Sequence, residues 1–340
     1  MEQVMKGGYR LNGQAPEQVA GKPLVSVITV VFNSVNLLEQ TIQSVLNQTW
    51  PDIEYIIIDG GSKDGTVDII RKYERKIAYW VSEPDGGLYD AMNKGLAAAT
   101  GDFVWFLNSG DLAYREDTLE QIFKDQRLKN EEQRSDDQDT RPKINDLSPN
   151  IQNPKSNIQN LIYYGDTMVV DSHYHEVGIR RLRPPEVLNW KSFRKGMLVC
   201  HQAILVSRSI AEPFDLKYKH SADFDWVIRA LRKASGKGER RKEKGERKSQ
   251  FTSSHLNTST SQPPQPPQPL QPFQPFQPIV NTHQILCSFL DGGHSKQNIP
   301  ASLRERFDIM RRNYGLIPTV LRHFLIAIRF GLYYLWNKRF

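Results

Sequence analysis

Oxygen-bearing side chains directly follow an apolar run in the first half of this chain. The run covers residues 103–107, and Asn108-Ser-Gly-Asp111 comes next. Carboxylate and amide oxygens in such a loop suit Mg²⁺ or Mn²⁺, hard cations that take few protein ligands and complete their shell with phosphate oxygens. Asp111 is therefore predicted to bind a divalent cation. The alternative is a turn that only closes a strand.

A second loop has the chemistry to contact a nucleotide. Asp59 ends the apolar run 53–59, and Gly-Gly-Ser-Lys-Asp-Gly-Thr66 follows it. An acid at the carboxyl end of a strand lies at the edge of the sheet, where it can accept hydrogen bonds from a base or a ribose. We expect Asp64 and Thr66 to form a turn and a helix cap, and Asp59 to face the ligand.

The elements that must position these loops alternate between strand and helix patterns. Apolar, β-branched runs predict strands at 24–32, 53–59, 77–81 and 103–107, and helical apolar spacing predicts helices at 35–47, 66–73 and 88–99. This order is typical of an α/β fold with a parallel sheet. Because ligands bind beyond the carboxyl ends of such strands, both loops are expected at one edge.

Length and composition exclude several classes of protein. The 340 residues fit two domains, or one α/β domain with insertions. Two cysteines exclude a disulfide scaffold and a four-cysteine zinc module, which favours the cytoplasm. Neither a secretory signal nor a membrane span is expected. The net charge of +7 comes from residues 232–248 and 301–340 and the remainder is acidic, so nucleic-acid binding is not expected.

Two stretches of biased composition interrupt the chain. Residues 129–160 are rich in Asn, Gln, Asp and Ser, and residues 236–278 pass from charged residues into a Gln-Pro-Pro repeat. The first stretch is expected to be disordered, and the repeat can hold only polyproline II structure. The chain is thus predicted to contain an N-terminal extension (1–22), an α/β domain with two insertions (23–295) and a basic helical region (296–340).

At these motifs the chain resembles the family 2 glycosyltransferases, whose GT-A fold is a Rossmann-like, mostly parallel sheet flanked by helices. The resemblance rests on segments 25–33, 58–66, 82–95 and 108–111, which stand in the family's order. The segment Asn108-Ser-Gly-Asp111 stands where the family carries its Asp-x-Asp metal motif. Asn108 replaces the leading Asp, which leaves Asp111 as the one strong metal ligand.

The second half of the chain resembles the same family at three places. Residues 222–229 are similar to the family's Glu-Asp motif, and Asp223 aligns with the acid that acts as base. Asp225 is a competing candidate, and the alternative for both is a favourable interaction with the helix dipole. His201-Gln202 resembles a pair in a subset of the family, where His201 is either structural or an acceptor or phosphate contact. Residues 289–295 resemble a segment that returns to the site.

The resemblance implies an inverting sugar transfer from a nucleotide-diphosphate sugar, with Mn²⁺ or Mg²⁺ as cofactor. Asp223 would take the proton of the acceptor hydroxyl, and Asp111 would hold the ion on the departing diphosphate. The contacts to the donor would come from Val30, Asp59, Asp90, Asn93 and Asn108. Each of these residues could equally stabilise a local turn or helix end.

The resemblance also implies a glycan or polyisoprenoid-linked acceptor in cell-surface polysaccharide synthesis, at the inner face of the plasma membrane. Residues 316–340 alternate apolar clusters with basic residues and include Tyr333, Tyr334 and Trp336. This pattern suits a helix that lies in a membrane interface. The alternative is a helix that packs on the α/β domain and exposes a basic face.

Three other functions compete with sugar transfer. A nicotinamide oxidoreductase needs Gly-x-Gly-x-x-Gly after its first strand, where this chain has Phe32-Asn-Ser-Val. A nucleotidyltransferase shares the sheet and the metal, but this chain lacks a basic, Gly-rich loop after the first strand. A non-enzymatic scaffold would use the Pro-Gln tract to dock in an aromatic groove.

Overall fold

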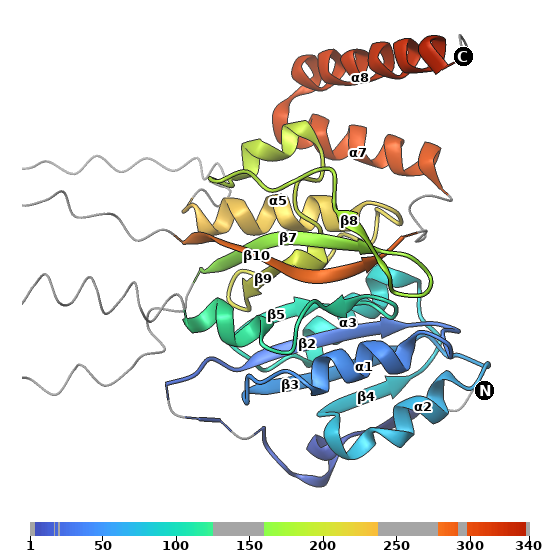
Figure 1. The fold of residues 1–340 in the computed structure, drawn as a ribbon, viewed down its shortest axis with the longest axis vertical. Helices are drawn as coiled ribbons and strands as arrows, with labels where there is room; N and C mark the ends of the chain where they lie inside the picture. Colours follow the sequence, from blue (N-terminus) through green and yellow to red (C-terminus); the bar gives the residue numbers. More distant parts are fainter. Residues whose placement is uncertain are drawn as a thin grey trace, which may run out of the picture.

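The computed structural model describes residues 4–16, 18–19, 21–124, 160–236, 278–291 and 298–337. Within them, the strands form one ten-stranded sheet with helices packed against it (Figure 1). The strands are β1 (Met5–Gly7), β2 (Val25–Val31), β3 (Ile53–Asp59), β4 (Tyr79–Ser82), β5 (Phe103–Phe106), β6 (Leu112–Ala113), β7 (Ile162–Val170), β8 (Glu176–Ile179), β9 (Ile204–Ser207) and β10 (Ile279–Leu290). The α-helices are α1 (Leu38–Leu46), α2 (Thr66–Lys72), α3 (Leu88–Ala98), α5 (Ala222–Ala234), α7 (Ile299–Tyr314) and α8 (Leu316–Asn337).

The first half of the sheet confirms the predicted order of elements. Strands β4, β3, β2 and β5 lie side by side and are parallel. Strand β2 is buried along its whole length, as its continuous β-branched sequence predicts for a strand covered on both faces. Helix α3 comes close to this sheet at Gly95, where a Cβ atom would lie 2.4 Å from Ile28 Cγ2. Helix α1 begins later than expected because residues 35–37 form a turn.

The second half makes the sheet mixed, although the sequence predicted a mostly parallel one. Strand β9 lies between β5 and β7 and is antiparallel to both. Strand β10 is parallel to β7 and antiparallel to β6. The alternation of strand and helix patterns that predicts parallel pairing ends after β5, so nothing in the local sequence specifies the direction of these strands.

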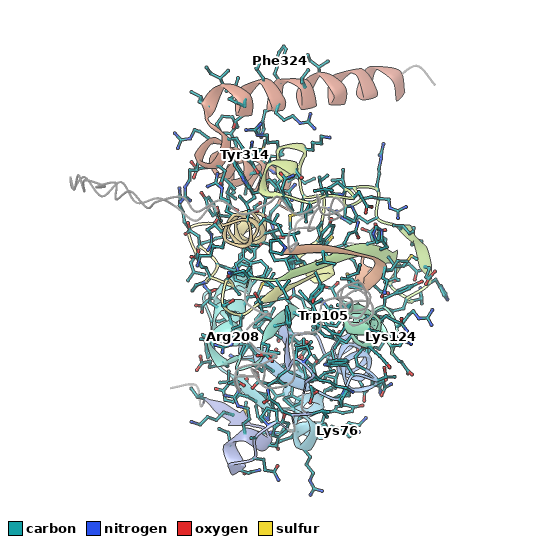
Figure 2. All side chains as sticks on the ribbon, turned by 90° about the vertical axis from the view of Figure 1, so that its left-hand side faces the viewer. Lys76, Trp105, Lys124, Arg208, Tyr314 and Phe324 are labelled. Atoms are coloured by element: carbon teal, nitrogen blue, oxygen red, sulfur yellow. The ribbon has the colours of Figure 1, made fainter. Side chains whose placement is uncertain are left out.

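The two ends of the chain add to this domain. Part of the predicted extension 1–22 forms β1, which pairs antiparallel with β4 at the edge of the sheet. Helix α7 packs on α5, and α8 follows α7 at the far end of the molecule (Figures 1 and 2). In the described part of the chain, no helix has the length and apolar character needed to cross a membrane. The insertions expected at 129–160 and 236–278 lie almost wholly outside the described residues.

An aromatic cluster joins the elements that carry the candidate site. Phe214 stacks on Tyr89 of α3 and on Trp226 of α5, with ring centroids 5.5 and 5.1 Å apart. Phe106 of β5 packs edge-on against Phe214 and Trp226. These rings hold the start of α3, the end of β5 and the first turns of α5 in fixed relation.

Candidate active site

A chain of hydrogen bonds links Asn108, His201 and Asp223. Asn108 Nδ2 lies 3.2 Å from His201 Nε2, and His201 Nδ1 lies 3.2 Å from Asp223 Oδ2. The two ring nitrogens of His201 thus face different partners, and Nδ1 is the one that donates to the carboxylate. The loop after β5 and the first turn of α5, which are far apart in the sequence, therefore meet at one histidine.

Asp223 is held by three donors. Besides His201, the hydroxyl of Tyr89 donates to Oδ1 at 3.0 Å, and the backbone N–H of Phe224 donates to the same oxygen at 2.9 Å. Burial raises the pKa of Asp223, but the hydrogen bond and charge of His201, with Arg306 and Tyr89, outweigh it and lower the pKa below its ordinary value. Asp223 is thus ionised and oriented at neutral pH.

Asp111 joins the same cluster through the residue next to His201. Gln202 Nε2 donates to Asp111 Oδ2 at 2.9 Å, and the backbone N–H of Leu290 approaches Oδ1 at 3.4 Å. Burial raises the pKa of Asp111 to about 6, against weaker lowering effects of Gln202, His201 and Leu290. Two consecutive residues, His201 and Gln202, therefore hold the two acids that the sequence predicted to work together.

The oxygen atoms of this loop fit a hard divalent cation. Asn108 Oδ1 is buried and has no hydrogen-bond partner in the described structure. Asp111 supplies a desolvated carboxylate, whose raised pKa a bound cation would reverse. The Asp111 loop does not bring together three His, Cys, Asp or Glu side chains; among the described residues, such a group occurs on a different turn. A cation here would thus have one carboxylate and one amide oxygen, with the other positions left for phosphate and water.

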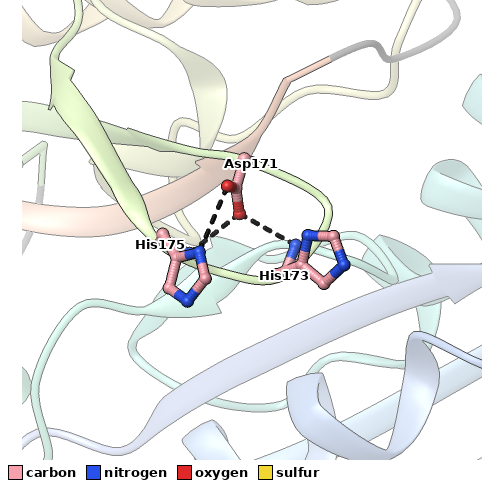
Figure 3. Close-up of side chains that lie close together, drawn as sticks. All are labelled: Asp171, His173 and His175. Carbon is pink, nitrogen blue, oxygen red and sulfur yellow. Dashed lines mark hydrogen bonds and ion pairs between the residues drawn. The ribbon is translucent and has the colours of Figure 1, made fainter.

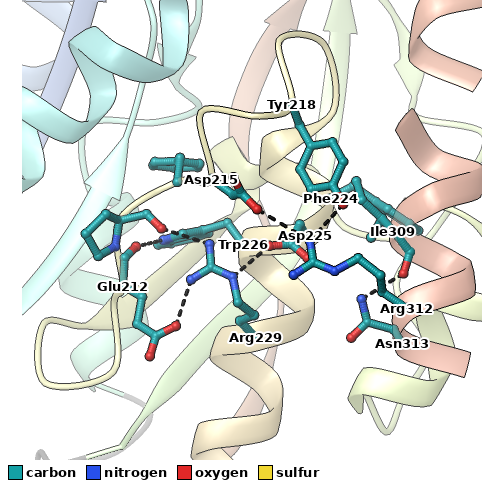
Figure 4. A network of polar contacts seen from close by, with 12 residues as sticks. Glu212, Asp215, Tyr218, Phe224, Asp225, Trp226, Arg229, Ile309, Arg312 and Asn313 are labelled. Carbon is teal, nitrogen blue, oxygen red and sulfur yellow. Dashed lines mark hydrogen bonds and ion pairs between the residues drawn. The ribbon is translucent and has the colours of Figure 1, made fainter. Parts of the chain in front are cut away.

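Asp225, the competing candidate for the base, lies in a separate network (Figure 4). Its Oδ2 accepts a hydrogen bond from Arg229 Nε at 2.7 Å, and Arg229 Nη1 also contacts Glu212 at 2.7 Å. Figure 4 shows these residues beside Arg312 of α7. The geometry therefore favours Asp223 over Asp225 as the acid of the site, because only Asp223 reaches the cluster around Asn108.

Asp59 and Asp90 form local contacts near the site. Asp59 is buried and accepts hydrogen bonds from the backbone of Gly61 and Ser62, and from the hydroxyl of Ser82 at 2.6 Å. It thereby fixes the loop between β3 and α2. Asp90 accepts from the backbone N–H of Gly86 at 2.9 Å at the start of α3. Both carboxylates shape the strand ends where a donor was predicted to lie.

Asn93 does not join the cluster. Its amide nitrogen donates to the carbonyl of Phe214 at 3.0 Å, and its oxygen accepts from the N–H of Phe214 at 2.7 Å. Asn93 therefore joins α3 to the segment before α5, and the nucleotide contact expected from the sequence stays a prediction. Val30 meets the site only through its backbone, since its carbonyl accepts from Ser109 N at 3.1 Å.

Sequence reasoning missed two residues that support the site. Tyr89 contacts Asp223. The one signal in the sequence was its position at the start of a helix, shortly after two glycines. Tyr174 donates from its hydroxyl to the carbonyl of Gly110 at 3.2 Å, from a hairpin that no motif singled out. Both contacts join segments that are distant in the sequence, so no local pattern could reveal them.

Comparisons with known proteins agree with this arrangement. The family model described as "Glycosyl transferase family 2" matches residues 26–131 of this chain. An uncharacterised glycosyltransferase of Mycobacterium tuberculosis is 34% identical over 213 residues, which cover 61% of this chain and 69% of that protein. TuaG of Bacillus subtilis, named as a putative teichuronic acid biosynthesis glycosyltransferase, is 44% identical over 103 residues, covering 29% of this chain and 40% of TuaG.

A solved structure supports the predicted fold. Staphylococcus aureus TarS 1–349, in complex with UDP-GlcNAc, superposes with a TM-score of 0.51 and 15% identity, covering 88% of this chain and 72% of that one. At this identity the likeness concerns the fold alone. Together with the family match and the Mycobacterium relative, it confirms the resemblance found in the motifs. The chain is an enzyme that belongs to glycosyltransferase family 2.

Proposed function

We propose that this chain transfers a sugar from a nucleotide-diphosphate sugar to an acceptor hydroxyl with inversion at the anomeric carbon. The observation that carries the proposal is the cluster in which His201 and Gln202 hold Asp223 and Asp111. It brings an ionised acid and a loop suited to a divalent cation to one place. Family membership makes sugar transfer the reaction that this pair would serve.

Asp223 is the proposed general base. In the transfer step, the acceptor oxygen bonds to the anomeric carbon, the bond from that carbon to the diphosphate breaks, and the acceptor proton passes to Asp223. His201 and Tyr89 orient the carboxylate by donating to its two different oxygens. Proton transfer to a positioned group contributes roughly 10²- to 10⁴-fold to a rate.

Asp111 and Asn108 are the proposed cation ligands. When bound there, Mg²⁺ or Mn²⁺ would neutralise the charge that develops on the departing nucleoside diphosphate. Asp59 and the loop that it fixes are proposed to receive the nucleoside, because they follow β3 at the same edge of the sheet as the Asn108–Asp111 loop, with the loop after β2 between them. Asp90 is proposed to reach the ribose or a phosphate from the start of α3.

The acceptor is proposed to be a cell-surface glycan or its polyisoprenoid-linked precursor. TuaG is named for teichuronic acid biosynthesis. A further relative from Mycobacterium bovis, 29% identical over 217 residues that cover 62% of this chain and 70% of that protein, is named for PGL/p-HBAD biosynthesis. Both names concern products of the cell envelope. The same class of product is therefore the first to test for this chain.

Contact with a membrane surface through α8 is part of this proposal. The helix exposes Ile317 (74%), Leu321 (59%) and Phe324 (63%), which lie on one face by their spacing. Figure 2 shows Phe324 at the outer end of the molecule. The alternative to a membrane contact was a helix that packs on the α/β domain and exposes a basic face. The residues of α8 named above form an exposed apolar face instead. The side chains from residue 329 onward, including Tyr333, Tyr334 and Trp336, lie outside the described part.

A donor screen with two matched variants tests the proposal. The chain is incubated with Mn²⁺ and individual nucleotide sugars, beginning with UDP-GlcNAc because TarS 1–349 was solved with it, and the released nucleotide is identified. Nucleoside diphosphate is the expected product, whereas pyrophosphate would indicate a nucleotidyltransferase. Asp223→Asn should lower turnover by about 10²- to 10⁴-fold with donor affinity little changed. Asp225→Asn is the control, because Asp225 pairs with Arg229 outside the cluster. A loss confined to Asp225→Asn would reassign the base.

A further inference from the structure

Asp171, His173 and His175 form a cluster at the turn between β7 and β8 that the proposed reaction does not use (Figure 3). One ligand atom from each residue lies within 4.8 Å of the other two. We propose that this turn binds a transition-metal ion of the Zn²⁺ class. Imidazole nitrogens favour Zn²⁺, Ni²⁺ and Cu²⁺, whereas the oxygen atoms of Asp111 and Asn108 favour Mg²⁺ and Mn²⁺. The chain would thus hold two metal sites of different chemistry.

Hydrogen bonds within the turn fix the carboxylate. Asp171 Oδ1 accepts from the backbone N–H groups of His173 at 2.8 Å and His175 at 2.9 Å. These bonds use one oxygen and leave Oδ2 directed at the imidazole of His175.

The separation of the ligand atoms suits a tetrahedral ion. Asp171 Oδ2 lies 3.3 Å from His175 Nδ1. Zinc bonds of about 2.0–2.1 Å place two ligands of a tetrahedral ion about 3.3–3.4 Å apart. A charge-assisted hydrogen bond between such groups is normally shorter, at about 2.7–2.9 Å. The rings of His173 and His175 lie side by side, with centroids 5.9 Å apart and planes 24° apart, so both imidazoles are close to the same carboxylate.

The backbone of the turn supports the same arrangement. Tyr174 adopts a φ of +62°, a left-handed conformation that is unfavourable for a residue with a bulky side chain. The residues on either side of Tyr174, His173 and His175, present their rings next to each other. The Tyr174 hydroxyl donates to the carbonyl of Gly110, which anchors the turn on the loop that carries Asp111.

Titration of the untagged 340-residue chain with ZnCl₂ tests the proposal. Competition against a chromophoric chelator would measure the affinity and the number of sites. His173→Ala, His175→Ala and Asp171→Asn are each expected to weaken the site at least about tenfold. Asp171→Asn keeps the oxygen that accepts from the backbone N–H groups of His173 and His175, and it removes Oδ2, the proposed metal ligand. Unchanged thermal unfolding of each variant would show that the fold is intact.

His283→Ala is the matched control. His283 is an exposed residue of β10 whose Nε2 contacts a carboxylate oxygen of Glu186 at 3.3 Å, without a second histidine. Wild-type and His283→Ala proteins should bind Zn²⁺ alike, and Co²⁺ in place of Zn²⁺ should give the visible absorption of a low-coordinate site that disappears in His173→Ala. Equal losses in His283→Ala and His175→Ala, or Zn²⁺ binding that survives the combined His173→Ala and His175→Ala changes, would overturn the proposal.

Discussion

At the scale of single residues, the cluster gives its two acids opposite properties. Both Asp111 and Asp223 are buried, and burial raises the pKa of a carboxyl group. Asp111 meets mainly the neutral amide of Gln202, so the effect of burial prevails. Asp223 accepts from His201 and Tyr89, whose effects outweigh burial. Neighbouring carboxyl groups with diverging pKa values are typical of sites with separate roles for each acid.

The raised pKa of Asp111 predicts a cost in stability. The folded chain holds the proton of Asp111 up to about pH 6, whereas the unfolded chain releases it near 3.8. The free energy of unfolding is therefore reduced above about pH 6 and recovers toward pH 4. Asp111→Asn should raise it by about 2–3 kcal/mol near pH 7.5, and by much less near pH 4, while sugar transfer falls. Urea unfolding of both proteins at the two pH values measures this, and equal stability near pH 7.5 would contradict it.

The contact between His201 and Asp223 predicts a change in the pH dependence of transfer. The hydrogen bond and charge of His201 help to lower the pKa of Asp223, so His201→Ala should raise it. A general base must be ionised, and the acidic limb of the kcat/KM profile should therefore move to higher pH. His283→Ala is the control, because His283 is an exposed residue of β10 that contacts Glu186 and not Asp223. A purely structural role of His201 would lower the rate without moving the profile.

At the scale of elements, the site depends on how α3 is held against the segment that precedes α5. Tyr89 and Asn93 lie one turn apart on α3 and face that segment together. Tyr89 stacks on Phe214, and Asn93 bonds both polar groups of the Phe214 backbone. The helix that begins beside the proposed donor site is thereby fixed to the chain that leads to Asp223.

The hydrogen bonds between Asn93 and Phe214 predict that Asn93 acts on stability and not on donor affinity. Asn93→Ala leaves the N–H and carbonyl of Phe214 without these partners, and each buried polar group left unpaired costs about 1–3 kcal/mol. We expect the free energy of unfolding to fall by that order, with nucleotide affinity unchanged at temperatures where the variant is folded. Chemical unfolding and equilibrium nucleotide binding would measure the two effects. A large loss of nucleotide affinity at unchanged stability would restore Asn93 as a donor contact.

At the scale of the whole molecule, the apolar face of α8 is the feature that the α/β domain does not explain. Helix α7 attaches to the domain through α5 and buries Ile309 and Met310. Helix α8 contacts α7 but leaves several large apolar side chains exposed. Exposed apolar patches of this kind mark interaction surfaces in soluble domains.

Flotation with phospholipid vesicles tests the proposed membrane contact. Vesicles with anionic lipid should carry the wild-type chain, and the combined Ile317→Ser, Leu321→Ser and Phe324→Ser changes should abolish flotation. These side chains are exposed, so thermal unfolding should not change. Val177→Ser is the control, because Val177 is 69% exposed on β8, away from α8. Equal flotation of the triple variant and the wild type would remove membrane contact from the proposal.

The sequence by itself determined the parallel strands β2 to β5, the helices between them and the loops at their carboxyl ends. Their residue patterns are local, and parallel strands with crossover helices leave few ways to arrange such a segment. It also singled out Asp111, Asn108, His201 and Asp223, because their motifs resemble those of one family.

Only the tertiary structure decided how these residues combine. The choice of Asp223 over Asp225 depends on which of two acids in one helical turn faces His201 and which faces Arg229. The two hydrogen bonds of Asn93 reach a backbone segment 121 residues away. The mixed pairing of β9 and β10 and the joining of β1 to the sheet edge likewise depend on long-range contacts. Local patterns fix periodicity and turns, whereas the direction of a side chain within a turn and the partner of a strand are set by packing between distant segments.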